Sequence, residues 1–208
     1  MRQDIGRLHI LTDTRGGREA LTVVSAATAA GAPVVQVRSK GCTDRTLHDF
    51  ASRVVEICTS NGAICIVNDR VDVALAVGAA GTHLGNDDLP IAAARRVAGP
   101  AHVIGGTARD PSKATELVAA GADYLGVGPS YATTTKSGLP ASLGPSGVAA
   151  VARAVEVPVV AIGGVTAGRV QEMLDAGAYG VAVVTAVSDA PDPTAVTRQL
   201  LQALEKHP

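Results

Sequence analysis

The sequence contains very few aromatic residues, because phenylalanine and tyrosine together make up 2% of its 208 residues and tryptophan is absent. Proteins that stack nucleic-acid bases, or that anchor partners through aromatic side chains, need more aromatic surface than this. Hydrophobic residues nevertheless make up 47% of the chain, so it has enough apolar surface to fold. The sequence therefore predicts a globular protein with an aliphatic core.

The sequence also lacks an excess of charge of one sign. Its 18 Lys and Arg residues are balanced by 19 Asp and Glu residues, which gives a formal net charge of −1. Nucleic acids and anionic membranes attract proteins with a basic surplus, so neither is expected as a partner.

No hydrophobic run approaches the roughly 20 residues of a membrane span, and the first residues show no apolar secretion signal. The three cysteines are an odd number without a C-x-x-C pair, which indicates buried thiols in a reducing compartment. We therefore expect a soluble cytoplasmic protein.

A short phrase recurs along the chain, in which Gly-Ala or a similar pair precedes an apolar run. It occurs around Gly31, Gly78, Gly121 and Gly177. This pattern is typical of a helix that ends at a glycine and is followed directly by a strand. The strands read as continuous apolar runs without alternation, which indicates parallel strands covered on both faces.

Eight such strands are predicted, each with room for a helix after it. They are Leu8 to Leu11, Val34 to Val37, Ile64 to Val67, Gly81 to Leu84, His102 to Gly105, Tyr124 to Val127, Val159 to Ile162 and Gly180 to Val184. Eight units in a chain of this length favour an α/β fold with one domain, a (β/α)8 TIM barrel over residues 1–208. An open doubly wound sheet is the alternative, but the first strand is followed by no G-x-G-x-x-G motif.

In a barrel of this kind the polar residues that follow the strands form the site. Gln36, Arg38 and Lys40 alternate at the end of the second predicted strand, so an amide and two cations could converge on a diphosphate. The alternative is a solvated strand end with two surface cations.

Carboxylates follow two neighbouring strands. Asp69 and Asp88 could share a Mg²⁺ ion that also takes phosphate oxygens, and Asn68 could donate to the same phosphates. Asp and Asn are also ordinary turn and helix-capping residues, which is the alternative reading.

A second group of phosphate-binding candidates follows the later strands. Gly163 and Gly164 allow backbone amides to approach a phosphate, and Thr185 could complete that cup. A long segment from Gly128 to Leu143 carries three threonines and Lys136, which can hold phosphate and close over a substrate. The alternatives are a tight turn and a flexible loop. His83 is read as a structural residue, since a single histidine in an apolar strand usually is.

These motifs, in this order, resemble the thiamine phosphate synthase family from about Leu8 to Leu204. The motifs are Gln36-Val37-Arg38-Ser39-Lys40, Val67-Asn68-Asp69-Arg70-Val71-Asp72, His83-Leu84-Gly85-Asn86-Asp87-Asp88-Leu89-Pro90, Gly121-Ala122-Asp123-Tyr124 with Gly126-Val127-Gly128-Pro129, Thr133-Thr134-Thr135-Lys136, and Ala161-Ile162-Gly163-Gly164-Val165. The family is a (β/α)8 barrel that joins hydroxymethylpyrimidine diphosphate to a thiazole phosphate, often carboxylated in bacteria. The resemblance implies a dissociative reaction, in which pyrophosphate leaves, a pyrimidine carbocation forms, and the thiazole nitrogen captures it.

The resemblance also implies residue roles. The pyrimidine diphosphate would be bound by Gln36, Arg38, Lys40, Asn68, Thr107 and Lys136, of which Arg38, Lys40, Thr107 and Lys136 would be catalytic. The thiazole phosphate would be bound by Thr133, Thr135, Gly164, Val184 and Thr185, and Mg²⁺ by Asp69 and Asp88. Thr107 stands where the family usually has serine, and the segment up to Arg109 lacks the family's usual Ser-x-His.

Three other functions stay open at this point. A thiazole tautomerase is the synthase-like relative without joining activity, but the diphosphate and metal positions are all present here. A phosphosugar isomerase or epimerase would need an acid–base pair at the strand ends. A phosphate-binding module without catalysis is the third. The expected partners are phosphorylated small molecules, and a homo-oligomer is possible.

Overall fold

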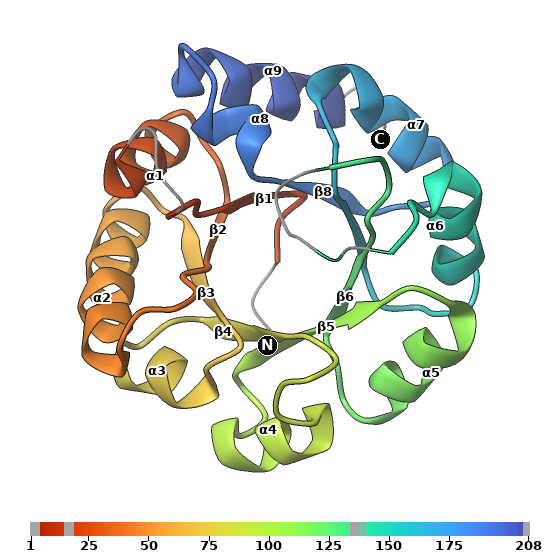
Figure 1. Ribbon diagram of the computed structural model, residues 1–208, viewed down its shortest axis with the longest axis horizontal. Coiled ribbons are helices and arrows are strands. Elements are labelled where there is room, and N and C mark those ends of the chain that lie inside the picture. The colour runs from red at the N-terminus through yellow and green to blue at the C-terminus, as the bar shows by residue number, and fades with distance from the viewer. Residues whose placement is uncertain (1–4, 15–18, 134–137, 139, 206–208) are drawn as a thin grey trace.

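The chain forms a closed barrel of eight parallel strands in sequence order, with helices around the outside (Figure 1). The structure, a computed structural model, describes residues 5–14, 19–133, 138 and 140–205. The strands are β1 (Leu8–Leu11), β2 (Val34–Val37), β3 (Ile64–Asn68), β4 (Gly81–Leu84), β5 (Val103–Ala108), β6 (Tyr124–Val127), β7 (Val159–Ile162) and β8 (Gly180–Val183). The predicted (β/α)8 barrel is confirmed, and the open sheet is excluded because β1 pairs with β8.

The predicted strands are correct except at four ends, one of which is the start of β5 at Val103, one residue later than expected. β3 includes Asn68, β8 stops one residue earlier than expected, and β5 runs on to Ala108. The prediction that β5 ends at Gly105 was wrong, because Gly105 and Gly106 carry no apolar side chain that would mark a continuing strand. They continue the ladder instead, with Thr107 paired to Gly126 of β6. Thr107 is therefore held within the sheet and does not follow it.

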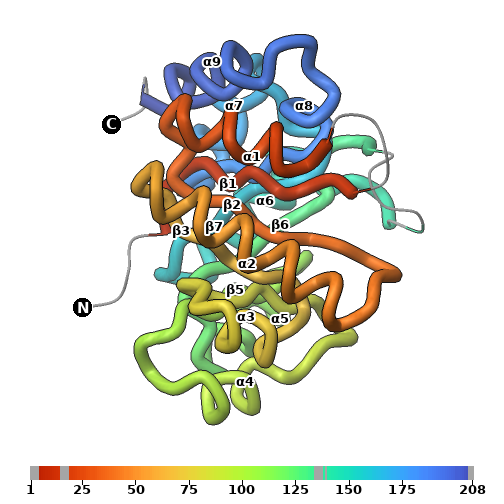
Figure 2. Tube along the Cα trace, turned by 90° about the vertical axis from the view of Figure 1, so that its left-hand side faces the viewer, coloured from red at the N-terminus to blue at the C-terminus, as the bar shows by residue number. Residues whose placement is uncertain are grey.

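The helices form the outer ring. They are α1 (Ala20–Ala29), α2 (Asp44–Ser60), α3 (Val71–Ala76), α4 (Ile91–Ala98), α5 (Pro111–Ala119), α6 (Gly144–Ala152), α7 (Val170–Asp175), α8 (Thr185–Ser188) and α9 (Pro193–Glu205), with a 3-10 turn at Ala167–Arg169. Figure 2 shows α9 next to α1, so the last helix meets the first and closes the ring. None of the helices in the described part of the chain combines the length and the hydropathy that a membrane crossing requires.

The four recurring glycines lie where the sequence places them, two residues beyond the last residue of a helix. Gly31, Gly78, Gly121 and Gly177 have φ values of 101°, 69°, 102° and 87°. A side chain disfavours this left-handed backbone, so glycine is the residue that ends a helix in this way. The repeat thus sets the position at which each of these chain segments turns back into the barrel.

The core has an inner and an outer part. Inside the barrel, Leu11, Val34, Ile66 and Val160 pack around Tyr124, the one fully buried tyrosine. Between strands and helices lie two further aliphatic clusters, which fit the sequence's shortage of aromatics. The inner cluster fills the barrel below its carboxyl end and forms the floor of the site.

Candidate active site

A cavity of about 290 Å³ opens at the carboxyl end of the barrel, and residues from all eight strands or the segments after them line it. Every predicted site residue within the described ranges lines this cavity, namely Gln36, Arg38, Lys40, Asn68, Asp69, Asp88, Thr107, Thr133, Gly164, Val184 and Thr185. The predicted residues Thr135 and Lys136 lie outside the described residues. The structure thus brings the two predicted phosphate regions to one cavity.

Asp69 is held at the end of β3 in a strained backbone conformation. Its φ is 67°, and no other non-glycine residue of the described ranges has a positive φ. Its amide donates to the His83 carbonyl at 2.8 Å, and its carboxylate accepts hydrogen bonds from the Lys40 ammonium and the Asn68 amide. Such backbone strain costs about 1–3 kcal/mol and is found mainly at functional sites. The fold therefore holds this carboxylate in place at a cost in stability.

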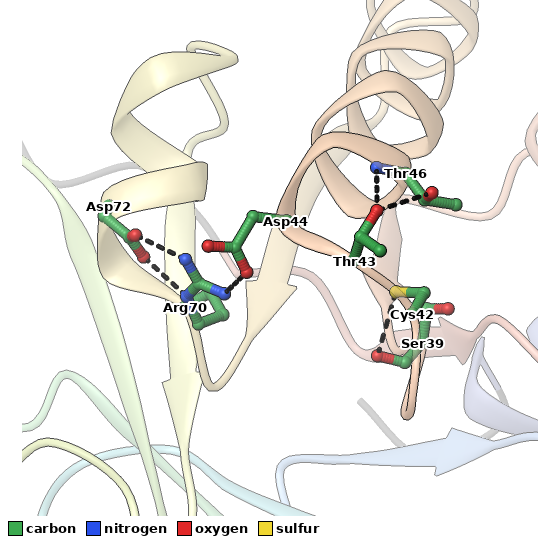
Figure 3. Close-up of polar contacts among 7 residues, drawn as sticks. All are labelled: Ser39, Cys42, Thr43, Asp44, Thr46, Arg70 and Asp72. Atoms are coloured by element: carbon green, nitrogen blue, oxygen red, sulfur yellow. Dashed lines mark hydrogen bonds and ion pairs between the residues drawn. The ribbon is translucent and has the colours of Figure 1, made fainter.

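The residue after Asp69 fastens this end of β3 to two helices (Figure 3). Arg70 donates to Asp44 at the start of α2 at 2.6 Å, and to both oxygens of Asp72 in α3 at 2.9 and 2.6 Å. The guanidinium lowers the pKa of both carboxyls, so both are ionised at neutral pH. Beside it, the Thr43 hydroxyl caps α2 by accepting from the Thr46 amide at 3.2 Å.

The second predicted metal ligand lies next to the first. Burial raises the pKa of Asp88, and so do its hydrogen bond to Asp69 and the repulsion between the two carboxylates. The Gly85 amide donates to Asp88 Oδ2 at 2.6 Å and fixes its orientation. Two adjacent carboxylates that favour a shared cation fit Mg²⁺, which prefers carboxylate oxygens and keeps positions for water and phosphate. In the described ranges no three His, Cys, Asp or Glu side chains group to hold a metal alone. Phosphate and water would complete the coordination.

Arg38 is positioned by a residue whose role the sequence did not reveal. Thr12, at the end of β1, is buried, and its hydroxyl donates to the Arg38 carbonyl at 3.0 Å and accepts from the Arg38 amide at 2.8 Å. The two hydrogen bonds between Thr12 and Arg38 form only because the barrel places these strand ends side by side. No residue pattern near Thr12 in the sequence therefore predicts them.

The glycine pair after β7 allows the segment that follows β6 to pack closely. A Cβ on Gly163 would lie 2.7 Å from Pro129, and one on Gly164 would lie 2.7 Å from the Ala132 carbonyl. The Gly163 carbonyl also accepts from the Tyr131 amide at 2.9 Å. The pair is therefore needed for packing, and Gly164 lines the cavity beside Thr185 as well.

Arg109 holds the two ends of the long segment after β6. Its guanidinium donates to the Gly128 carbonyl at 2.7 Å and to the Ala141 carbonyl at 2.8 Å. No role was predicted for Arg109, because these acceptors are backbone carbonyls that no motif identifies.

His83 lines the cavity, although the sequence favoured a purely structural role for it. Its two ring nitrogens lie 3.0 Å from the Tyr124 hydroxyl and 2.9 Å from the Thr107 hydroxyl. Burial lowers the pKa of His83 to about 4, so the ring is neutral at physiological pH. The missed signal is its position on β4, where an inward side chain near the strand's carboxyl end meets the cavity.

Comparisons with known proteins show the family of this chain. The family model described as thiamine monophosphate synthase matches residues 8–187. The chain is 57% identical over 203 residues to the thiamine-phosphate synthase of Salinispora tropica, covering 96% of this chain and 98% of that protein. It is 42% identical over 207 residues to that of Salinibacter ruber, covering 98% and 90%.

Solved structures show the same relationship. The thiamine phosphate pyrophosphorylase from Pyrococcus furiosus superposes with a TM-score of 0.88 at 34% identity, covering 96% of each chain. A 3-hexulose-6-phosphate synthase superposes with a TM-score of 0.73 at 19% identity and shares the fold alone. This chain belongs to the thiamine monophosphate synthase family.

Proposed function

We propose that the protein is a Mg²⁺-dependent transferase that joins hydroxymethylpyrimidine diphosphate to a thiazole phosphate and releases pyrophosphate, giving thiamine phosphate. The observation that carries the proposal is that one cavity holds two anion-binding regions. Arg38 and Lys40 lie with the Asp69–Asp88 pair, and Gly164 and Thr185 line the same cavity. Two phosphorylated substrates can therefore meet there.

The cations next to the carboxylate pair suit the departure of a diphosphate. When the bond between the pyrimidine methylene carbon and the diphosphate oxygen breaks, its electron pair leaves with the oxygen. Arg38 and Lys40 stabilise that growing negative charge, and donors placed in advance at such a position are among the largest contributions to catalysis. The thiazole nitrogen then gives its lone pair to the methylene carbon, which forms the new bond.

Asp69 and Asp88 would hold the metal ion. A bound Mg²⁺ neutralises charge on the diphosphate and orients it. The Gly85 amide donates to Asp88 and the Lys40 ammonium donates to Asp69, and these contacts orient the two carboxylates.

The reaction as written needs no protein base, because the thiazole nitrogen attacks with a lone pair that carries no proton. The cavity agrees with this. The two histidines that line it, His9 and His83, are buried and have pKa values lowered to about 4. An isomerase or epimerase would instead need an acid–base pair that exchanges protons near neutral pH. The three free cysteines suit a reducing compartment, and we place the reaction in the cytoplasm.

The test is to incubate the purified protein with both substrates and Mg²⁺ and to measure pyrophosphate together with thiamine phosphate, after oxidation to its fluorescent form. We expect both products in equal amounts, and neither when one substrate is omitted. Folded protein that binds thiazole phosphate but forms no product would overturn the proposal and favour the tautomerase.

A further inference from the structure

A chain of polar side chains crosses the barrel at the floor of the cavity. It runs from the Thr107 hydroxyl on β5 to His83 on β4, then to the Tyr124 hydroxyl on β6 and the Gln36 amide on β2. Both ends of this chain, Thr107 and Gln36, are predicted to contact the pyrimidine substrate. Its two middle members have no assigned role.

The barrel leaves space for this chain by omitting side chains next to it. A Cβ on Gly105 would lie 2.2 Å from the Tyr124 ring and 2.6 Å from His83 Nδ1, and one on Gly126 would lie 2.9 Å from His83 Cε1. His83 is 8% exposed and Tyr124 is 1% exposed. The His9 ring packs edge-on against Tyr124 with centroids 5.4 Å apart. The His83 and Tyr124 rings are therefore enclosed on several sides and keep one arrangement.

A neutral His83 ring carries one N–H, so one of its nitrogens donates and the other accepts. The Gln36 side chain hydrogen-bonds the Tyr124 hydroxyl, and an amide N–H that faces the phenol oxygen would leave the phenol proton for His83. Tyr124 then gives its single proton to Nδ1 of the neutral His83 ring, which leaves the other ring nitrogen, Nε2, as the donor to Thr107. The Thr107 oxygen accepts from His83, so its own proton is left to point toward the cavity.

We infer that His83 is a positioning residue that, together with Tyr124, fixes the Thr107 hydroxyl as a hydrogen-bond donor to the substrate. The matching ligand atom is an acceptor such as a pyrimidine ring nitrogen, and an exocyclic amino group does not fit this position. The opposite hydrogen-bond direction would make Thr107 an acceptor and select the amino group. This inference rests on the proposed function for the identity of the ligand, but not for the hydrogen-bond direction.

The hydrogen-bond direction is tested first, without any substrate. Proton–nitrogen correlation spectra of the ¹⁵N-histidine-labelled protein at pH 7.5 distinguish a ring protonated at Nε2 from one protonated at Nδ1, and His83→Asn assigns the signal. We expect the Nε2–H form. An Nδ1–H ring would overturn the inference, whether or not the protein forms thiamine phosphate.

The link to the substrate is tested by kinetics. Thr107→Val keeps the side chain's shape without its hydroxyl, and we expect the KM for the pyrimidine diphosphate to rise roughly tenfold, with the KM for thiazole phosphate unchanged. Thr107→Ser should restore the wild-type value, because it restores the donor.

His83→Asn should raise the same KM, because asparagine can still reach Tyr124 but is too short to reach Thr107. In the Thr107→Val background the His83→Asn change should add less than twofold to the KM, because both substitutions act through one hydroxyl.

The matched control is the other histidine–threonine pair, formed by Thr82 of β4 and His102 just before β5. Thr82→Val and His102→Gln should change neither KM. Equal rises in both KM values, or fully additive effects of the two substitutions, would overturn the inference. If His83→Asn does not fold, the Thr107 variants and the spectra still decide. If the wild-type protein forms no product, the proposed function fails, while the spectra still test the hydrogen-bond direction.

Discussion

Two histidine–threonine pairs join the β4 and β5 segments at opposite ends of the barrel, and their surroundings differ. At the amino end, His102 bonds the Thr82 hydroxyl at 2.9 Å. At the carboxyl end, His83 bonds the Thr107 hydroxyl at the same distance and lines the cavity. The same kind of histidine–threonine hydrogen bond thus supports the fold at the amino end and lines the cavity at the carboxyl end.

The neighbours of each pair show the difference more fully. At the amino end, Arg95 donates to the carbonyls of Gly99, His102 and Gly121 at 2.5 to 3.0 Å, and to Asp123 at 2.6 Å. At the carboxyl end, by contrast, two carboxylates lie side by side and one of them has a strained backbone. At the amino end the Arg95 cation pairs with one carboxylate, whereas at the carboxyl end two carboxylates lie together and favour a shared cation.

The largest effect is expected from removing a charge at the carboxyl end. Asp69→Asn should lower kcat by at least 100-fold, because it weakens the metal site and the stabilisation of the departing pyrophosphate. The same change relieves repulsion with Asp88, so the melting temperature should stay the same or rise. Product assays and thermal unfolding measure both. A variant with a near-normal rate would show that Asp69 is not part of the site.

The converse is expected at the amino end. Asp123→Ala leaves Arg95 and the Ile104 amide without their shared acceptor, and breaking such a buried pair costs about 3 kcal/mol. Urea unfolding should show this loss of unfolding free energy. Both KM values should stay within twofold of wild type at a temperature where the variant is folded. A changed KM would mean that the two ends are not independent.

His9 gives a pH-dependent test of the barrel interior. Burial lowers its pKa from 6.5 to about 4, and its Nε2 bonds the Ile5 carbonyl at 2.8 Å. The unfolded chain therefore takes up a proton more readily than the folded one. Its contribution to stability is complete above pH 6.5 and is lost as the pH falls toward 4.

Between pH 7 and pH 5 this contribution should fall by about 2 kcal/mol. Urea unfolding of wild type and His9→Asn at both pH values isolates it, since the other groups titrate in both proteins. An exposed histidine, changed in His48→Asn, is the control. Equal pH dependence of wild type and His9→Asn would contradict a neutral buried ring.

The smallest effect is expected from Arg70→Ala. Its partners Asp44 and Asp72 are exposed, so the unfolding free energy should fall by less than about 1 kcal/mol, and less still in high salt. Because Arg70 follows Asp69, its loss should leave the Asp69 carboxylate less firmly held. We therefore expect kcat to fall a few-fold. An unchanged kcat in low salt would show that the backbone alone fixes Asp69.

The sequence predicts the barrel well because its signals are local. A glycine after each of several helices and an apolar run after it define the repeat, and parallel strands then bring their polar ends together. The predicted end of β5 was wrong for a local reason too, because the apolar run that marks the strand stops before Gly105 and Gly106. The packing of Tyr124 and His83 against Gly105, and of Leu117 against Gly106, explains why this strand carries glycines, and it depends on residues distant in sequence.

The site was predictable only as far as it consists of strand ends. Asp69 and Asp88 follow apolar runs, so their meeting at one rim follows from the fold. The roles of Thr12 and Arg109 depend on backbone atoms of distant residues, which no spacing along the chain reveals. The assigned roles of Thr135 and Lys136 stay predictions, because both residues lie outside the described ranges.

The most direct test of the central claim, that the carboxyl end carries the chemistry on a metal-bound diphosphate, is a Mg²⁺ titration of the rate of thiamine phosphate formation. We expect no rate in chelator, saturation with Mg²⁺, and a midpoint at least tenfold higher in Asp88→Asn but unchanged in Asp123→Ala. A full rate in chelator, or a wild-type midpoint in Asp88→Asn, would contradict the account.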